Sequence, residues 1–251
     1  MANVTQLKHL EHLEDEMLNY GVEGCIASVN FLKELRKMLG CDNSTGFMQT
    51  KWDGAPSVVC GTDPLNGMFF VGTKSVFAKN SKACYDDVDV DLYYEGDLAE
   101  KLKYSLKYFS TLGIQGIVQG DLLFTTDVKR ETVNGEKLYT FTPNTITYGI
   151  PVDHPIGVAT SKAKIGVVFH THYRGTDFQT MQAVAGAKVK GSIEVLSVDN
   201  DTPMDRVGLN HSEEMLFDKY VANIEKMCAA SGDFLDELTT LSGCLLYTSD
   251  A

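Results

Sequence analysis

The spacing of apolar residues changes near residue 46, and this change limits the fold more than any other feature of the sequence. Apolar residues recur at helical spacing over 4–20 and again over about 26–39, which predicts two N-terminal helices. From residue 46 onward the apolar runs become short, and a segment rich in Gly, Asp, Pro and Asn separates 57–60 from 68–71. A β-hairpin is therefore expected soon after the helices.

Strands are expected to outnumber helices in the rest of the chain. After Asp97, Leu and Phe residues recur at the spacing of one helical face, which predicts a helix that Asp97 caps and that ends near Ser110. Further strands are expected over 116–124, 138–141, 145–148 and 164–173, and a last helix over 212–230. Because helices and strands do not alternate regularly, the predicted fold class is α+β with an antiparallel-rich sheet.

The same pattern divides the chain into four parts. We expect an N-terminal helical segment over 1–45, a core over 46–200 and a C-terminal helical segment over 201–243. Residues 244–251 look like translated adapter sequence, so we expect this tail to be non-native and the natural protein to continue beyond Gly243.

The net charge of -12 restricts the ways in which this chain could bind nucleic acid. A protein that binds by general phosphate neutralisation usually carries a broad basic surface. Any polynucleotide would therefore have to meet a local basic groove. Acidic charge is also an ordinary means of keeping a cytosolic protein soluble.

The six cysteines are scattered, with no Cys-x-x-Cys pair and no grouping with histidine. This spacing predicts neither a zinc ribbon nor a disulfide framework. No apolar run approaches the length of a membrane span. We therefore expect a reducing, cytoplasmic location and no membrane partner, while the oligomeric state stays open.

The residues 51–56, Lys-Trp-Asp-Gly-Ala-Pro, place a lysine before a turn and between two strand-like segments. A lysine at such a position can project into a cleft, where it can attack phosphorus once it has lost its proton. The ordinary alternative is a surface lysine that precedes a Gly-Pro turn.

Two further segments downstream of Lys51 carry a charged residue next to or within a strand-like run. Residues 69–75 place Lys74 after a short strand, and residues 116–124 place Asp121 within an apolar strand. Together with Lys51, these segments resemble the covalent nucleotidyltransferase superfamily of ATP-dependent DNA and RNA ligases, in which a Lys-x-Asp-Gly lysine takes AMP or GMP as a phosphoramidate. Lys74 stands where arginine is usual, and Asp121 replaces the usual glutamate.

The resemblance implies a nucleotidyltransferase-like core, ATP or GTP with Mg²⁺, and a nucleic-acid end as acceptor. It implies Lys51 as the catalytic nucleophile, Asp121 as the metal ligand, and nucleotide contacts from Trp52, Asp53, Gly54, Lys74, Phe141, Lys188 and Lys190. Phe141 or Tyr148 would supply the aromatic ring that stacks on the base.

The similarity to the ligase pattern weakens after residue 164. Ile165 stands where the family has an acidic metal-binding residue, and Lys188 and Lys190 are the only candidates for its final lysine pair. A degenerate module that binds nucleotide or nucleic acid without catalysis is therefore the first alternative. The sequence as a whole also resembles a family encoded by tailed phages of marine bacteria, which implies a host-cytoplasm location.

His170 and His172 provide a second alternative, because residues two apart on a regular strand face the same side. With Asp121 or Asp153 they could hold a metal in a hydrolase. A viral structural or interaction protein is the third alternative. The chain contains no Walker loop, no Gly-x-Gly-x-x-Gly and no Gly-x-Ser-x-Gly segment, so those chemistries are not predicted.

Overall fold

The computed structural model describes residues 12–40, 49–201 and 208–237. The chain divides into two compact units. One comprises Gln49–Asn200, and the other is helical and is formed by segments from the two ends of the chain, 12–40 and 208–237 in their described parts. No described helix combines the length and the apolar character that crossing a membrane would need.

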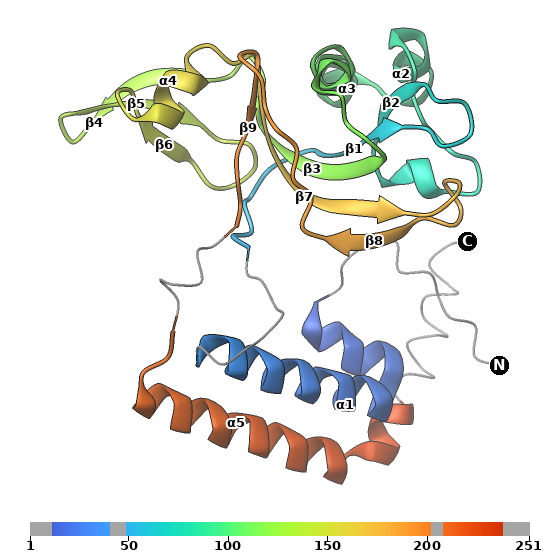
Figure 1. Ribbon diagram of the computed structural model, residues 1–251, viewed down its shortest axis with the longest axis vertical. Helices are drawn as coiled ribbons and strands as arrows, with labels where there is room; N and C mark the ends of the chain where they lie inside the picture. The colour runs from blue at the N-terminus through green and yellow to red at the C-terminus, as the bar shows by residue number, and fades with distance from the viewer. Residues whose placement is uncertain (1–11, 41–48, 202–207, 238–251) are drawn as a thin grey trace. The chain divides into compact units, whose positions relative to one another are not determined.

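The 49–200 unit contains two mainly antiparallel sheets and several short helices (Figure 1). Its strands are β1 (Ser57–Thr62), β2 (Phe69–Gly72), β3 (Ile117–Phe124), β4 (Lys129–Val133), β5 (Glu136–Phe141), β6 (Tyr148–Pro151), β7 (Ile165–Arg174), β8 (Gln182–Ala185) and β9 (Val195–Ser197). Its helices are η1 (Lys74–Phe77), α2 (Asp87–Tyr93), α3 (Gly96–Phe109), η2 (Ser110–Leu112) and α4 (Pro155–Thr160). The α+β class with antiparallel sheets is thus confirmed.

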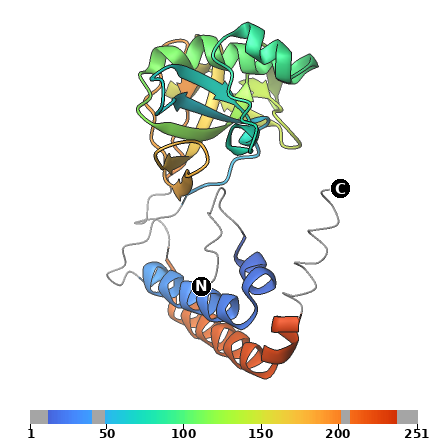
Figure 2. The same ribbon diagram turned by 90° about the vertical axis from the view of Figure 1, so that its right-hand side faces the viewer.

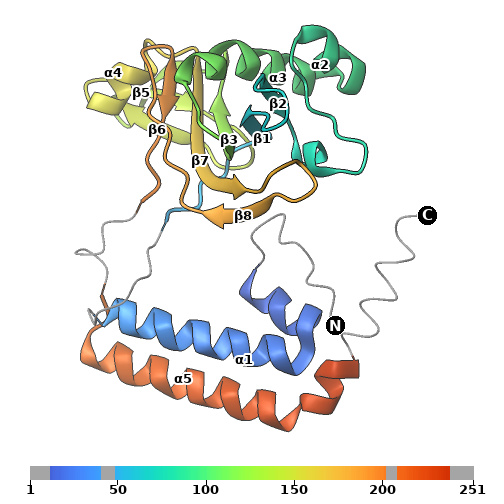
Figure 3. The ribbon, with the colours of Figure 1, turned by 45° about the vertical axis from the view of Figure 1, so that its right-hand side comes forward.

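The larger sheet has the strand order β2-β1-β3-β7-β8, with β9 paired in parallel to β7. The smaller sheet has the order β4-β5-β6 and lies with α4 beside β3 and β7, as Figures 1 and 3 show. Its strand β4 is exposed along its whole length and has no apolar alternation, which explains why no strand was expected there.

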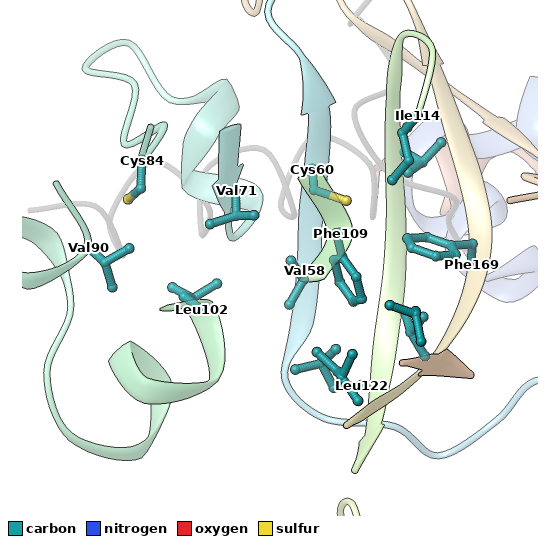
Figure 4. Packing of buried hydrophobic residues seen from close by; sticks show 14 of the residues in the cluster. Val58, Cys60, Val71, Cys84, Val90, Leu102, Phe109, Ile114, Leu122 and Phe169 are labelled. Carbon is teal, nitrogen blue, oxygen red and sulfur yellow. The ribbon is translucent and has the colours of Figure 1, made fainter. Parts of the chain in front are cut away.

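Helix α3 covers one face of the larger sheet (Figure 2). Leu102 and Phe109 of α3 are fully buried against apolar side chains of β1, β3 and β7, and the ring of Phe109 contacts that of Phe169 edge-on at 5.5 Å (Figure 4). The helix begins two residues earlier than expected, with Glu95 at the N-cap position, so Asp97 lies in its first turn and pairs with Lys101 at 2.9 Å instead of capping it. On the opposite face, Val59 of β1 packs with Val76 and Phe77 of η1 in a second apolar cluster.

The helical unit consists mainly of α1 (Leu13–Leu39) and α5 (His211–Ala230). Gly21 has a positive φ of 57° and breaks α1 into two helical stretches, in agreement with the two predicted helices over the described residues. Asn210 and Glu213 form a capping box at the start of α5. Residues 244–251 lie outside the described part of the chain.

A disulfide between Cys25 and Cys228 joins α1 to α5. This finding corrects the expectation from the cysteine spacing. The two residues are 203 positions apart, and their Cα atoms are 6.1 Å apart, within the range that a disulfide spans. Such a pairing leaves no trace in local spacing, because only the packing of α1 against α5 brings the thiols together.

Candidate functional site

The face of the larger sheet opposite α3 carries a line of polar side chains. In the register of β1 and β3, Ser57 pairs with Asp121 and Val59 pairs with Gln119. Paired residues and residues two apart share a face, so Ser57, Gln119 and Asp121 emerge together. Their neighbour Leu122 packs into the cluster under α3, which confirms that Asp121 points the other way.

The segment 51–56 runs directly against this line. The Ala55 amide donates to the Leu122 carbonyl at 2.9 Å, and the Leu122 amide donates to the Pro56 carbonyl at 3.1 Å. At Gly54, an added Cβ would lie only 2.6 Å from the Cβ of Asp121. The structure therefore brings the Lys-x-Asp-Gly segment and Asp121 together, and it does so through a glycine that no larger residue could replace without displacement.

The Asp53 carboxylate is held by the loop between β5 and β6. Its carboxylate accepts hydrogen bonds from the Asn144 side chain, from the amide and hydroxyl of Thr145 and from the Ile146 amide, at 2.8–3.0 Å. The bonds from Asn144 and then Thr145 hold the pKa of this carboxyl well below its usual range. In this structure Asp53 thus fixes the loop between β5 and β6 to the Lys51 segment, and its expected nucleotide contact stays a prediction.

The aromatic residues expected at the nucleotide pack against one another instead. The Trp52 ring lies 4.9 Å from that of Tyr148, and the Phe141 ring lies 5.7 Å from Tyr148 and 5.0 Å from Phe124. Phe141 is only 3% exposed. This burial does not support stacking of Phe141 on a base, whereas Trp52 and Tyr148 are only partly buried.

A β-bulge gives His170 a position that regular strand alternation would not. Gln119 pairs with Thr171 and Gly120 pairs with Phe169, which leaves His170 between them without an opposite residue. The imidazole Nε2 of His170 lies 3.4 Å from the Asp121 carboxylate, and its Nδ1 lies 2.8 Å from the Thr171 hydroxyl. His170 therefore joins Asp121 on the polar face.

The same bulge separates His170 from His172. His172 pairs with Val118, whose side chain packs in the cluster under α3, so the two imidazoles emerge on opposite faces. Burial and then the nearby Arg174 lower the pKa of His172. No group of three His, Cys, Asp or Glu side chains in the described ranges could hold a metal ion. The proposed two-histidine metal site is therefore not supported.

Lys51 and Lys74 are exposed, and Lys74 follows β2. Both β2 and β3 run toward the Ser57 end of β1, so Lys74 leaves the sheet at the same end as Asp121, with β1 between them. Hydroxyl groups of Thr73, Ser75 and Tyr94 bond to one another and hold the turn around Lys74.

The other basic candidates lie beyond β8. Lys188 and Lys190 are exposed, while the residues between and before them, Val189 and Ala187, pack into the cluster under α3. Ile165 is completely buried in that same cluster, which leaves no place for a metal-binding carboxylate at its position.

Sequence reasoning missed a buried hydrogen-bond chain beside Asp121. The Tyr173 hydroxyl donates to the Gln119 side-chain oxygen at 2.5 Å, and the Gln119 amide donates to the Ser57 hydroxyl at 2.8 Å. The available signal was the spacing of two between Gln119 and Asp121 in an otherwise apolar strand. Four cavities of the described residues are lined by other side chains, and none of these four includes Lys51, Lys74 or Asp121.

Comparison with known proteins identifies one family. A model of a family of unknown function, DUF6267, matches residues 3–248. Neither a curated protein nor a solved structure matches the chain. Because the match covers nearly the entire sequence, the chain belongs to the DUF6267 family.

Proposed function

We propose that this protein transfers a nucleotide through a covalent intermediate on Lys51 and that the acceptor is a nucleic-acid end. One observation carries the proposal: Gly54 packs on Asp121, which places the segment that begins with Lys51 against the acidic residue of β3. The resemblance of both segments to ligase motifs supports the same conclusion.

The chemistry consists of two displacements at phosphorus. The Nζ lone pair of Lys51 forms a bond to the α-phosphorus of ATP or GTP, the bond to the bridging oxygen breaks, and pyrophosphate leaves with that electron pair. The proton lost by the lysine passes to solvent. A phosphate oxygen at the nucleic-acid end then displaces Lys51 from phosphorus, and the electron pair of the P–N bond returns to nitrogen.

Lys74 would offset the negative charge that builds on the phosphate oxygens during each displacement. Its position at the Asp121 end of the sheet supports this role. A Mg²⁺ ion also fits the site in one respect, because Mg²⁺ is commonly bound by one or two carboxylates together with substrate phosphates. The half-buried carboxylate of Asp121 would hold it, and the bound ion would supply further charge neutralisation.

The burial of Ile165 favours a second candidate function, the binding of nucleotide without transfer. In the ligase pattern this strand carries an acidic metal-binding residue, whereas here the position belongs to the core under α3. A chain that retains Lys51 and Asp121 but lacks that carboxylate could still hold a nucleoside triphosphate.

Covalent labelling tests both candidates. The protein is incubated with ATP or GTP labelled at the α-phosphate and a divalent metal, then denatured. We expect the wild type to retain label, and Lys51→Ala and Lys51→Arg to retain none, because a guanidinium stays protonated and offers no lone pair. Lys79→Ala, which removes another exposed lysine of the same unit, is the matched control and should label normally.

The outcomes separate the two functions. Lys74→Ala should slow labelling by roughly 10²–10³-fold if it stabilises the developing charge as an oxyanion-site donor does. Absence of label combined with nucleotide binding that Lys51→Ala weakens would establish the second candidate. Absence of both label and binding would refute the assignment of Lys51.

A further inference from the structure

A cationic cleft opens between the smaller sheet and the core, away from Lys51. It has a volume of about 320 Å³, and its cations are Lys129 and Arg130 at the start of β4 and Lys164 just before β7. No carboxylate lines it. Within the described residues none of these three cations makes an ion pair, whereas Lys101 and Lys103 on α3 are both paired with carboxylates.

The distribution of charge makes this cleft unusual in the chain. Residues 49–200 carry 15 Lys and Arg against 17 Asp and Glu, so the net charge of -12 comes mainly from the two ends of the sequence. The acidic residues of this unit are also concentrated, because seven of them fall within 86–100. The local basic groove that a polynucleotide would require in an acidic protein is therefore present here.

Aromatic and hydroxyl groups stand among the cations. Tyr139 is the residue opposite Arg130 in the β4–β5 pairing, so their side chains emerge on the same face of the hairpin, and Tyr104 of α3 lines the cleft from another side. Thr125 and Thr126 add hydroxyls at the exit of β3. Cations and hydroxyls bind phosphate oxygens, and tyrosine rings stack on bases of any identity.

We propose that this cleft, lined by Lys129, Arg130, Lys164, Tyr104 and Tyr139, binds the phosphodiester backbone of a single-stranded nucleic acid. Three cations around one cavity repel one another, and a polyanion relieves that repulsion. The tyrosines favour a nucleic acid over a free phosphate or an acidic peptide, because neither of those offers a base to stack. The site requires no covalent chemistry at Lys51, so it can hold or fail independently of the proposed nucleotidyl transfer.

Fluorescence anisotropy with the full chain and a labelled oligothymidylate of roughly 10 nucleotides tests the proposal. Three phosphate contacts on a single strand predict a slope of about -2 for log affinity against log salt, so binding should be about 20-fold weaker at about 200 mM salt than at about 50 mM. In Lys129→Gln/Lys164→Gln only one contact remains, and the same change of salt should weaken binding about threefold. The double variant should also bind at least about tenfold more weakly than wild type at about 50 mM salt.

Two controls separate the possible ligands. Lys33→Gln/Lys37→Gln removes the same charge from lysines already paired with glutamates on the helical unit, and it should bind the oligonucleotide as the wild type does. Tyr139→Leu should weaken oligonucleotide binding about fivefold or more. The inhibition constant of inorganic phosphate should not change, since phosphate has no base to stack on the ring. Thermal melts of each variant verify folding.

Three results would overturn the proposal. The first is no binding of the oligonucleotide by wild type at about 50 mM salt. The second is equal weakening by the Lys129/Lys164 and Lys33/Lys37 pairs, which would indicate a general charge effect. The third is displacement of the oligonucleotide by inorganic phosphate or thymidine monophosphate at equal phosphate concentration, which would reduce the cleft to a site for small anions.

Discussion

Replacement of Gly54 by alanine tests the contact on which the proposed site depends. A Cβ at residue 54 would lie 2.6 Å from the Cβ of Asp121 and 2.8 Å from the carbonyl oxygen of Leu122. Neither neighbour is the free end of a flexible side chain, so the strain cannot be relieved by a rotamer change. The segment or strand β3 has to move.

The structure sets the size of the effect. Insertion of a methyl group into a well-packed site typically costs 1–3 kcal/mol, and two rigid neighbours place Gly54→Ala at about 2 kcal/mol. For a chain of this length such a loss lowers the melting temperature by roughly 4–8 °C. The backbone of Gly54 does not have a positive φ, so the cost arises from packing alone.

Tryptophan fluorescence is the suitable assay, because Trp52 is the only tryptophan in the chain and lies two residues from Gly54. Its emission reports unfolding of the 49–200 unit during a urea titration. Lys79→Ala, at an exposed position of the same unit, is the matched control. We expect Lys79→Ala to change the free energy of unfolding by less than about 0.5 kcal/mol.

Equal urea midpoints for Gly54→Ala and wild type would refute the close packing of Gly54 on Asp121. Gly54→Ala could instead be destabilised yet still accept nucleotide at the wild-type rate well below its melting temperature. That result would support the close packing but show that the proposed transfer does not depend on it.

Three further predictions concern other contacts. Asp53→Asn should speed hydrogen exchange at the Thr145 amide near neutral pH. Folding lowers the pKa of the Asp53 carboxyl, so its stabilising effect is present above the ordinary pKa of 3.8 and declines as the pH falls below that value. The exchange rates of variant and wild type should therefore converge in acid. Cys228→Ser should lower the free energy of unfolding of the helical unit by about 2–5 kcal/mol, measured by denaturation followed by circular dichroism. A reductant should lower the free energy of unfolding of the wild type by the same amount and leave that of the variant unchanged, because the bond to Cys25 is then absent in both. Leu102→Ala, at a fully buried position under α3, should cost about 2–5 kcal/mol by urea titration, and a loss below about 1 kcal/mol would contradict the packing described.

Periodicity predicted the elements whose apolar faces are continuous. The stripe on α3, the break that divides α1 and the apolar runs of β1 and β3 are all visible in the sequence, because each buries one face along its own length. Strands β4, β8 and β9 were not predicted: β4 is exposed throughout, and β8 and β9 have only four and three residues. Their pairing depends on neighbouring strands and not on a local pattern.

The candidate site was predictable only in part, for the same reason. The segments around Lys51, Lys74 and Asp121 were singled out in the sequence by a resemblance to ligase motifs, and in the structure Gly54, three residues after Lys51, lies against Asp121. The bulge that turns His170 toward Asp121 has no signature in the sequence, since it arises from the register between β3 and β7.

The sequence by itself therefore determined the α+β class, the helices and strands whose apolar faces are continuous, and the residue types available for chemistry. Only the tertiary structure decided that Asp53 anchors a loop about 90 residues away, that Cys25 meets Cys228, and that Lys129 and Lys164 share one cleft. The physical reason is the range of the interactions. A helix or strand reveals itself through neighbours a few positions apart, whereas these contacts form only when distant segments pack together.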